Sequence, residues 1–80
     1  MGSTQSARHR ALLAVIRGLR HQKKWSQEQA AKKIGWTQSK LAQVEVGQRQ
    51  VYYSEVFDLA KGYGLDPLRL IKLAIDWEGK

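Results

Sequence analysis

The 80-residue sequence contains no cysteine, and its two histidines, His9 and His21, lie far apart with no ligand cluster around them. Without cysteine the chain has neither a disulfide framework nor a thiolate metal site. The isolated histidines supply no alternative set of metal ligands. The sequence therefore predicts neither a bound metal nor any other cofactor.

Long apolar runs are missing as well. No segment approaches the roughly 20 apolar residues that a membrane-spanning helix requires. The N-terminus also lacks the apolar core of a secretory signal peptide. We therefore expect a cytoplasmic protein with no membrane partner.

The sequence shows no recognisable set of catalytic side chains. Its seven acidic residues are scattered, without an evident carboxylate pair, and there is no Ser/His/Asp set. Acid–base and nucleophilic catalysis need such groups within hydrogen-bond reach of one another. We therefore expect no enzymatic activity, no catalytic residues and no small-molecule ligand.

Basic residues outnumber acidic ones, and they are unevenly distributed. The net charge is +7, from 14 Lys and Arg against seven Asp and Glu. Residues 1–33 carry +7, residues 34–50 carry +1 and residues 51–80 carry −1. This asymmetry favours a polyanion on one face and a different partner on another, the alternative being an ordinary solvated basic surface.

Helical periodicity dominates the sequence, and no segment shows the alternation of a β-strand. The pattern predicts an all-α fold of five short helices in one domain, which is all that a chain of this length accommodates. The first helix runs from residue 7 to about residue 23, with an apolar stripe at helical spacing formed by Leu12, Val15, Ile16 and Leu19.

Capping residues divide the remaining chain into four helices. Ser26 is the expected N-cap of the second helix, with Gln29 at capping-box spacing, and Gly35 ends it. Thr37 opens the third helix, which closes at Gly47. A fourth is expected to start at Ser54 or a neighbour and to close near Gly62 or Gly64, and Asp66-Pro67 starts the fifth.

The predicted boundaries place the folded domain at residues 7–74. Residues 1–6 are expected to be a flexible N-terminus, in which Met1-Gly2-Ser3 is either the native start or a remnant of cloning. Residues 75–80 are left as a C-terminal tail and assigned to a candidate dimer interface.

The second and third predicted helices indicate a function. Two short helices joined by a glycine-containing turn of a few residues are what a helix-turn-helix requires. The first helix of that motif crosses the DNA backbone, and the N-terminal residues of the second reach base edges in the major groove. The first turn of the third helix, residues 37–40, is polar throughout and can make such contacts.

The sequence resembles the Cro/phage-repressor family of helix-turn-helix proteins over about residues 12–72. Residues 26–35 are similar to the family's positioning helix, and residues 37–47 to its recognition helix with the closing Glu-x-Gly. The family's spacing is also matched by Leu19, Arg20, Leu59, Ala60 and Gly64. The resemblance implies a lambda-repressor-like DNA-binding domain that binds a double-stranded DNA operator as a small dimeric transcriptional repressor.

The resemblance also implies roles for individual residues. Base contacts are expected from Gln38, Ser39, Lys40 and Gln43, of which glutamine suits adenine and lysine suits guanine. Phosphate contacts are expected from Lys24, Gln27, Thr37 and Arg49, and Gln27 is also expected to brace Gln38. Arg20 and Glu45 are implied to form a partly buried structural ion pair rather than to touch DNA.

Several positions depart from the family pattern, among them Val51, which stands where proline is common. Lys24 replaces the usual glycine before the second helix, which predicts a less sharp turn. Trp36 stands in the inter-helix turn in place of a small aliphatic residue, either filling the core or exposed for a contact. Gly62-Tyr63 replaces Ala-Leu, which predicts early fraying of the fourth helix.

The near-neutral last third of the chain is the candidate surface for a homodimer, because no separate oligomerisation domain is present. The expected interface residues are apolar or aromatic: Tyr52, Tyr53, Leu68, Ile71, Ile75 and Trp77.

Two alternatives to a phage-type repressor stay open at this point. An antitoxin or restriction-modification controller protein shares the fold, and only the neighbouring gene would distinguish it. A protein-interaction module without specific DNA binding would be expected to lose the polar character of residues 38–40, which is retained.

Overall fold

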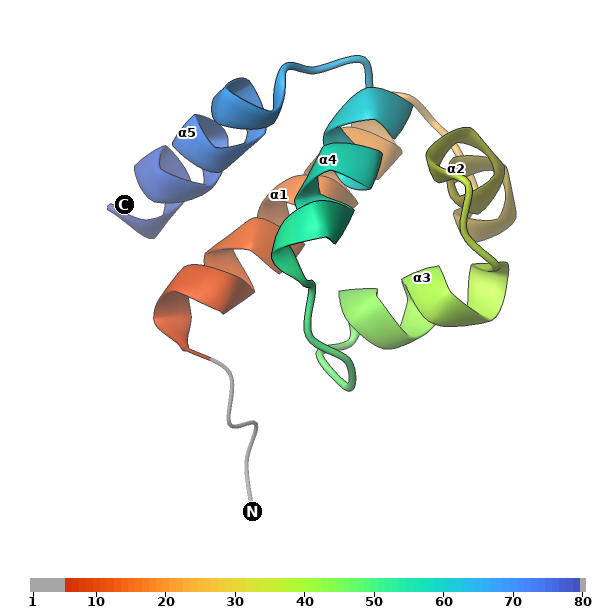
Figure 1. Cartoon of the computed structure of the whole chain (residues 1–80), viewed down its shortest axis with the longest axis horizontal. Coiled ribbons are helices and arrows are strands. Elements are labelled where there is room, and N and C mark those ends of the chain that lie inside the picture. Colours follow the sequence, from red (N-terminus) through yellow and green to blue (C-terminus); the bar gives the residue numbers. More distant parts are fainter. Residues whose placement is uncertain (1–5, 80) are drawn as a thin grey trace.

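The computed structural model describes residues 6–79, and within this range it contains five α-helices and no strand. The helices are α1 (Ala7–Gln22), α2 (Gln27–Ile34), α3 (Gln38–Glu45), α4 (Tyr53–Gly62) and α5 (Pro67–Glu78) (Figure 1). The prediction of an all-α fold with five short helices is therefore confirmed.

Three of the predicted N-caps start helices as expected. Ser26, Thr37 and Asp66 precede α2, α3 and α5, and the side-chain oxygen of each accepts a backbone N–H of the first turn. Such bonds satisfy amides that have no partner within the helix. The predicted residues thus fix where the two central helices and the last helix begin.

The start of α4 lies next to the predicted residue, and the end of α5 lies beyond the predicted one. Tyr52 is the N-cap of α4, two residues before Ser54, and its amide donates to Glu55 Oε1 at 2.9 Å. Residues 75–78 belong to the last turns of α5 rather than to an irregular tail. Of the N-terminal segment predicted to be flexible, residues 1–5 lie outside the described range, and Ser6 caps α1.

The core lies where all five helices meet. Its largest fully buried side chains are Ile16 of α1, Leu41 and Val44 of α3, Leu59 of α4 and Leu70 of α5. Small alanines of α2, Ala30 and Ala31, are buried in the same cluster. In Figure 1, α1 and α5 lie side by side, while α2 and α3 occupy the opposite end of the molecule.

The α4 helix does not fray early, so that prediction is wrong. It continues to Gly62, and the following Tyr63 is buried and packs in the core. A Cβ atom on Gly62 would lie 2.6 Å from Ile34 Cγ1 and 2.9 Å from Ile34 Cα. Glycine at this position therefore lets α4 pack against the backbone of α2, and Tyr63 holds the end of the helix in the core.

Candidate nucleic-acid interface

The turn into α2 is tight even though it lacks glycine. Lys24 adopts a left-handed conformation with φ 60°, which costs a non-glycine residue roughly 1–2 kcal/mol. The expected blunter turn is therefore wrong, because Lys24 takes the conformation that glycine usually supplies. Ser26 then closes both hydrogen bonds of the predicted capping box with Gln29, at 3.1 and 2.8 Å.

The turn between α2 and α3 reverses the chain within three residues. Gly35 has φ 90°, a left-handed conformation that glycine adopts without strain. The amides of Gly35 and Trp36 both donate to the Ala31 carbonyl, at 2.8 and 2.9 Å. Thr37 Oγ1 then accepts from the Lys40 amide at 3.1 Å, which starts α3. The two helices are thus set at a fixed angle by local hydrogen bonds.

Glu45, at the end of α3, is only 2% exposed and anchors this helix to the rest of the protein. Arg20 of α1 donates from Nε to Glu45 Oε2 at 2.8 Å and from Nη2 to Oε1 at 3.0 Å. Gln27 Nε2 also donates to Oε1, at 3.0 Å, and Arg17 donates to the Glu45 carbonyl oxygen. Paired hydrogen bonds between arginine and carboxylate hold both position and orientation.

An aromatic pair extends this anchor to α4. Tyr63 stacks on Trp25 with ring centroids 5.8 Å apart, and Arg20 Nη1 donates to the Trp25 carbonyl at 3.2 Å. Burial raises the pKa of Tyr63 to about 12, with a further increase from the Glu45 charge and a partly opposing effect of Arg20. The orientation of α3 therefore depends on α1, α4 and the turn before α2.

The predicted base-contacting residues fall into two groups. Gln38, Ser39 and Gln43 are exposed on α3. Lys40 is different, because its Nζ lies 2.7 Å from Glu55 Oε2 and its side chain is 28% exposed. The structure thus brings Gln38, Ser39 and Gln43 to the open surface and turns the lysine toward α4.

The predicted phosphate contacts are also placed differently from one another. Lys24 is exposed in the turn before α2, and Thr37 is exposed at the N-cap of α3. Gln27 is half-buried, and its amide donates to Glu45, a contact that was not predicted. The roles expected for Gln27 toward phosphate and toward Gln38 stay predictions. Arg49 extends beyond α3, with Nη2 3.5 Å from Glu55 Oε2.

A comparison with known families matches residues 11–70 to a family described as "Helix-turn-helix domain". The match covers three quarters of the chain and contains α2, the turn and α3 in full. The chain belongs to the helix-turn-helix domain family. No curated protein and no solved structure gave a significant match.

The predicted dimer residues of this helix-turn-helix domain are all exposed but do not form one surface. Ile71 and Ile75 of α5 line a groove of about 550 Å³ together with Leu12 of α1 and Val56 of α4. Trp77 lines a separate groove of about 310 Å³ beside α1. The ring centroid of Tyr52 lies 6.0 Å from Cζ of the Arg49 guanidinium.

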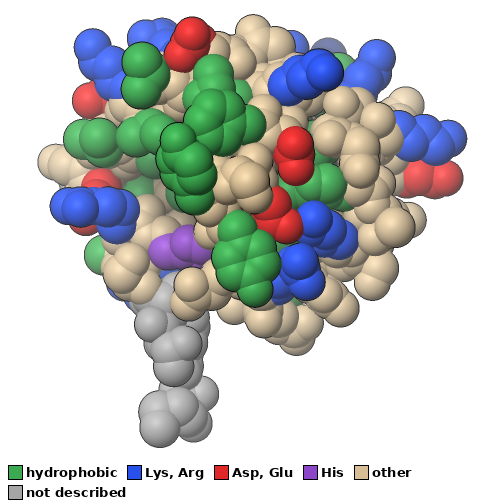
Figure 2. Space-filling model, viewed as in Figure 1, with side chains coloured by type: hydrophobic (Ala, Val, Ile, Leu, Met, Phe, Trp, Pro, Cys, Tyr) green, Lys and Arg blue, Asp and Glu red, His purple; other side chains and the backbone are tan. Residues whose placement is uncertain are grey.

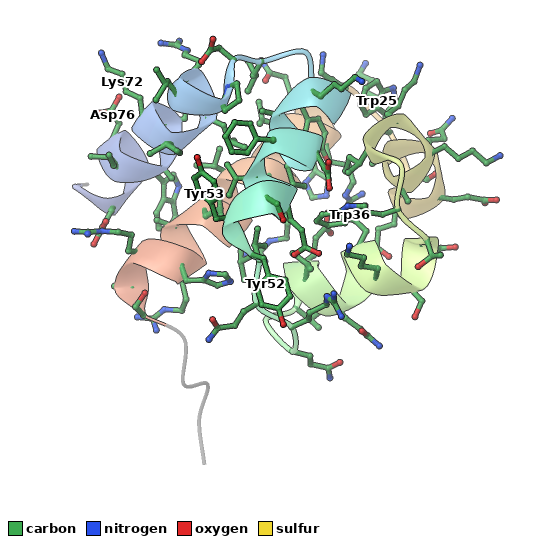
Figure 3. All side chains as sticks on the ribbon, viewed as in Figure 1. Trp25, Trp36, Tyr52, Tyr53, Lys72 and Asp76 are labelled. Atoms are coloured by element: carbon green, nitrogen blue, oxygen red, sulfur yellow. The ribbon has the colours of Figure 1, made fainter. Side chains whose placement is uncertain are left out.

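Hydrophobic side chains gather over α4 and α5 on the face seen in Figure 2. Tyr53, labelled in Figure 3, packs edge-on against Phe57 with ring centroids 5.1 Å apart. We call the set of Tyr53, Val56, Phe57, Ile71 and Ile75 the α4–α5 apolar surface. It contains three of the six predicted interface residues, Tyr53, Ile71 and Ile75, together with Val56 and Phe57, which were not predicted.

Sequence reasoning missed three side chains that shape the helix-turn-helix domain. Glu55 is buried against Lys40 and Arg49, Phe57 adds to the α4–α5 apolar surface, and Trp25 joins the anchor around Glu45. Their partners lie far away in sequence, so no local spacing pointed to them. An acid three residues after the Tyr52 N-cap was the one available signal for Glu55.

Trp36 packs against the core, which agrees with the core-filling alternative for this residue. Its indole Nε1 donates to Asp58 Oδ2 at 3.4 Å, linking the α2–α3 turn to α4. Figure 3 shows the side chain in this position, between α3 and α4.

Within residues 6–79, no three His, Asp or Glu side chains lie close enough together to hold a metal ion. Among the helices of the same range, none has the length and apolar character needed to cross a bilayer.

Proposed function

We propose that this protein binds double-stranded DNA sequence-specifically as a homodimer and represses transcription by occupying an operator. The observation that carries the proposal is the polar first turn of α3, held open to solvent by the buried Arg20–Glu45 pair. A helix fixed in this way loses little backbone conformational entropy when it enters the major groove.

Amide and hydroxyl side chains are the expected readers of the base edges. Gln38 is placed at the start of α3, where a glutamine amide donates to and accepts from adenine. Ser39 and Gln43 lie on the same helix and are exposed. Lys24 and Thr37 supply phosphate contacts nearby, and the net charge of +7 favours DNA over neutral or basic partners.

The register of residues 26–47 supports the Cro/phage-repressor type within the helix-turn-helix family. A repressor of this type acts in the cytoplasm and needs no catalytic activity, because occupying a promoter is sufficient. We propose both properties for this protein.

A selection from a randomised duplex pool, read by fluorescence anisotropy, tests the DNA proposal. We expect the wild type to enrich a palindromic motif. Gln38→Ala should reduce the free-energy discrimination between bases at one position of that motif by about 1–3 kcal/mol. Gln48→Ala, at a position beyond the end of α3, is the matched control and should enrich the wild-type motif. Weak, steeply salt-dependent binding with no motif would contradict specific recognition and favour an interaction module.

The second part of the proposal is that two copies associate through the α4–α5 apolar surface. Apolar side chains that gather on one exposed face often mark an interface, and a two-fold dimer would present two α3 helices to successive major grooves. Sedimentation equilibrium should give the mass of two chains. Ile75→Glu should give the mass of one chain, whereas Lys72→Glu on the same helix should remain dimeric. A monomeric wild type would contradict the proposed dimer but not the proposed binding to DNA.

A further inference from the structure

Glu55 connects α4 to the basic side chains beside the DNA-reading helix. It is 7% exposed, and its Oε2 lies 2.7 Å from Lys40 Nζ and 3.5 Å from Arg49 Nη2. Its other oxygen, Oε1, accepts the Tyr52 amide at 2.9 Å and so caps α4. One carboxylate therefore holds two cations and a helix N-terminus at once.

Lys40 is also held by an aromatic ring. Its Nζ lies 4.4 Å from the centroid of Trp36, within the distance at which a cation is attracted to the face of an indole ring. Trp36 is fixed in turn by its packing on the core and by the hydrogen bond of Nε1 to Asp58. The ammonium group is thus held between Glu55 of α4 and Trp36 of the α2–α3 turn, with the Lys40 side chain 28% exposed.

The ionised state of Glu55 persists in spite of its burial. Burial by itself raises the pKa of this carboxyl, but hydrogen bonds from Lys40 and the Tyr52 amide, with the charges of Lys40 and Arg49, lower it below its usual value of 4.5. At neutral pH the carboxylate is therefore charged and offsets positive charge on both cations. A partly buried ion pair of this kind is less screened by salt than a fully exposed one.

We propose that Glu55 is a specificity-determining residue that withholds Lys40 from DNA and leaves base reading to the neutral side chains of α3. The inference rests on the proposed DNA-binding function. A free lysine at the third position of α3 would bind any phosphate within reach, which raises affinity for all sequences alike. Holding it on Glu55 keeps non-specific affinity low, so Gln38, Ser39 and Gln43 contribute a larger share of the discrimination between sequences.

The substitution Glu55→Gln separates the charge of this residue from its capping role. Gln retains an oxygen that accepts the Tyr52 amide, as in the usual capping box, but it no longer neutralises Lys40. We expect the affinity for random-sequence duplex to rise on the order of tenfold at low salt. The slope of log affinity against log salt concentration should steepen by the amount expected for about one additional phosphate contact. The ratio of operator to random-duplex affinity should fall accordingly.

The control variant is Asp76→Asn, which adds the same charge on α5. Figure 3 shows Asp76 at the end of the molecule opposite α3, and it should change the salt dependence far less. Adding Lys40→Met to Glu55→Gln should remove the gain in random-duplex affinity, which assigns that gain to the released lysine. Thermal unfolding of each variant shows whether the fold is retained.

A labelling experiment tests the restraint on Lys40 without DNA. An amine-reactive ester should modify Lys40 more slowly than the exposed Lys61 of α4, and Glu55→Gln should accelerate labelling at Lys40 alone. Equal labelling rates in the wild type and in Glu55→Gln would overturn the inference, as would equal random-duplex affinity of the two proteins when the wild type does bind DNA. A wild type that binds no DNA would instead overturn the proposed function, and the specificity role with it.

Discussion

Glu45 shows at the residue scale how a single side chain fixes the position of α3. Its carboxylate is buried, and both oxygens accept hydrogen bonds from Arg20. Removing one partner of a buried pair leaves the other charged and without compensation, which costs far more than the pair contributes in itself. Arg20 is therefore a structural residue even though it is one of many cations in a basic chain.

We expect Arg20→Ala to lower the free energy of unfolding by roughly 3–5 kcal/mol. A domain of this kind has about 5–15 kcal/mol in total, so the variant should unfold at a markedly lower temperature and urea concentration than the wild type. Arg8→Ala provides the matched control, because Arg8 also pairs with a glutamate but its side chain is 81% exposed. Urea denaturation should give a loss below about 1 kcal/mol for that variant. Equal losses for both variants would contradict the structural role.

The Arg20–Glu45 contact was expected because the sequence resembles a family in which the two positions pair, and the structure places the two residues together. Lys40 was expected to face DNA for the same reason, and its contact with Glu55 was not. No family pattern or local periodicity relates residues 40 and 55, since the pairing exists only because α4 packs next to α3. Contacts of this kind depend on tertiary structure and escape a reading of the sequence alone.

At the scale of helices, two glycines in helical conformation have opposite consequences. Gly18 lies in α1 with nothing within 4 Å of where a Cβ would be, whereas a Cβ on Gly62 of α4 would meet the side chain and backbone of Ile34. Helix propensity favours alanine equally at both positions. Packing therefore decides whether a change to alanine raises or lowers the free energy of unfolding.

We expect Gly18→Ala to raise the free energy of unfolding by about 0.4–1 kcal/mol, since alanine loses less backbone entropy on folding. We expect Gly62→Ala to lower it by about 1–3 kcal/mol, because α2 and α4 must move apart. Chemical denaturation of the two variants measures both. The close packing of α4 on α2 would be in doubt if Gly62→Ala proved as stabilising as Gly18→Ala.

Helix boundaries marked by their own residues were easier to predict than those set by packing. Ser26, Thr37 and Asp66 were identified from their own side chains, because an N-cap acts within three residues of itself. The end of α4 at Gly62 was also predicted from the glycine, whereas the packing of the following Tyr63 on Trp25 was not. The extension of α5 to Glu78 was likewise missed, since nothing local ends a helix at residue 74.

At the scale of the whole molecule, two titratable groups in different parts of the fold make its stability depend on pH. His9 lines the groove beside Ile71 and Ile75 at the end of α1, and Glu55 lies beside α3. Burial lowers the pKa of His9 below its usual 6.5, because the groove disfavours the charged imidazole. Among the described residues, His9 Nε2 is buried with no hydrogen-bond partner, which agrees with the neutral form.

These shifts predict stability that falls in two steps as the pH is lowered. An acid whose pKa is lower in the folded state than in the unfolded state stabilises the fold above its unfolded pKa, and this contribution is lost as the pH falls through the folded value. A histidine that burial keeps neutral has the same direction of effect. The unfolded state takes up the proton first, so the fold loses stability as the pH falls. The first loss should therefore begin below pH 6.5 from His9, and the second below pH 4.5 from Glu55. Urea denaturation of His9→Gln should show no loss in the first interval and retain the second. The same decline in both proteins between pH 7 and pH 5 would assign the first step to a group other than His9, because the introduced glutamine does not titrate.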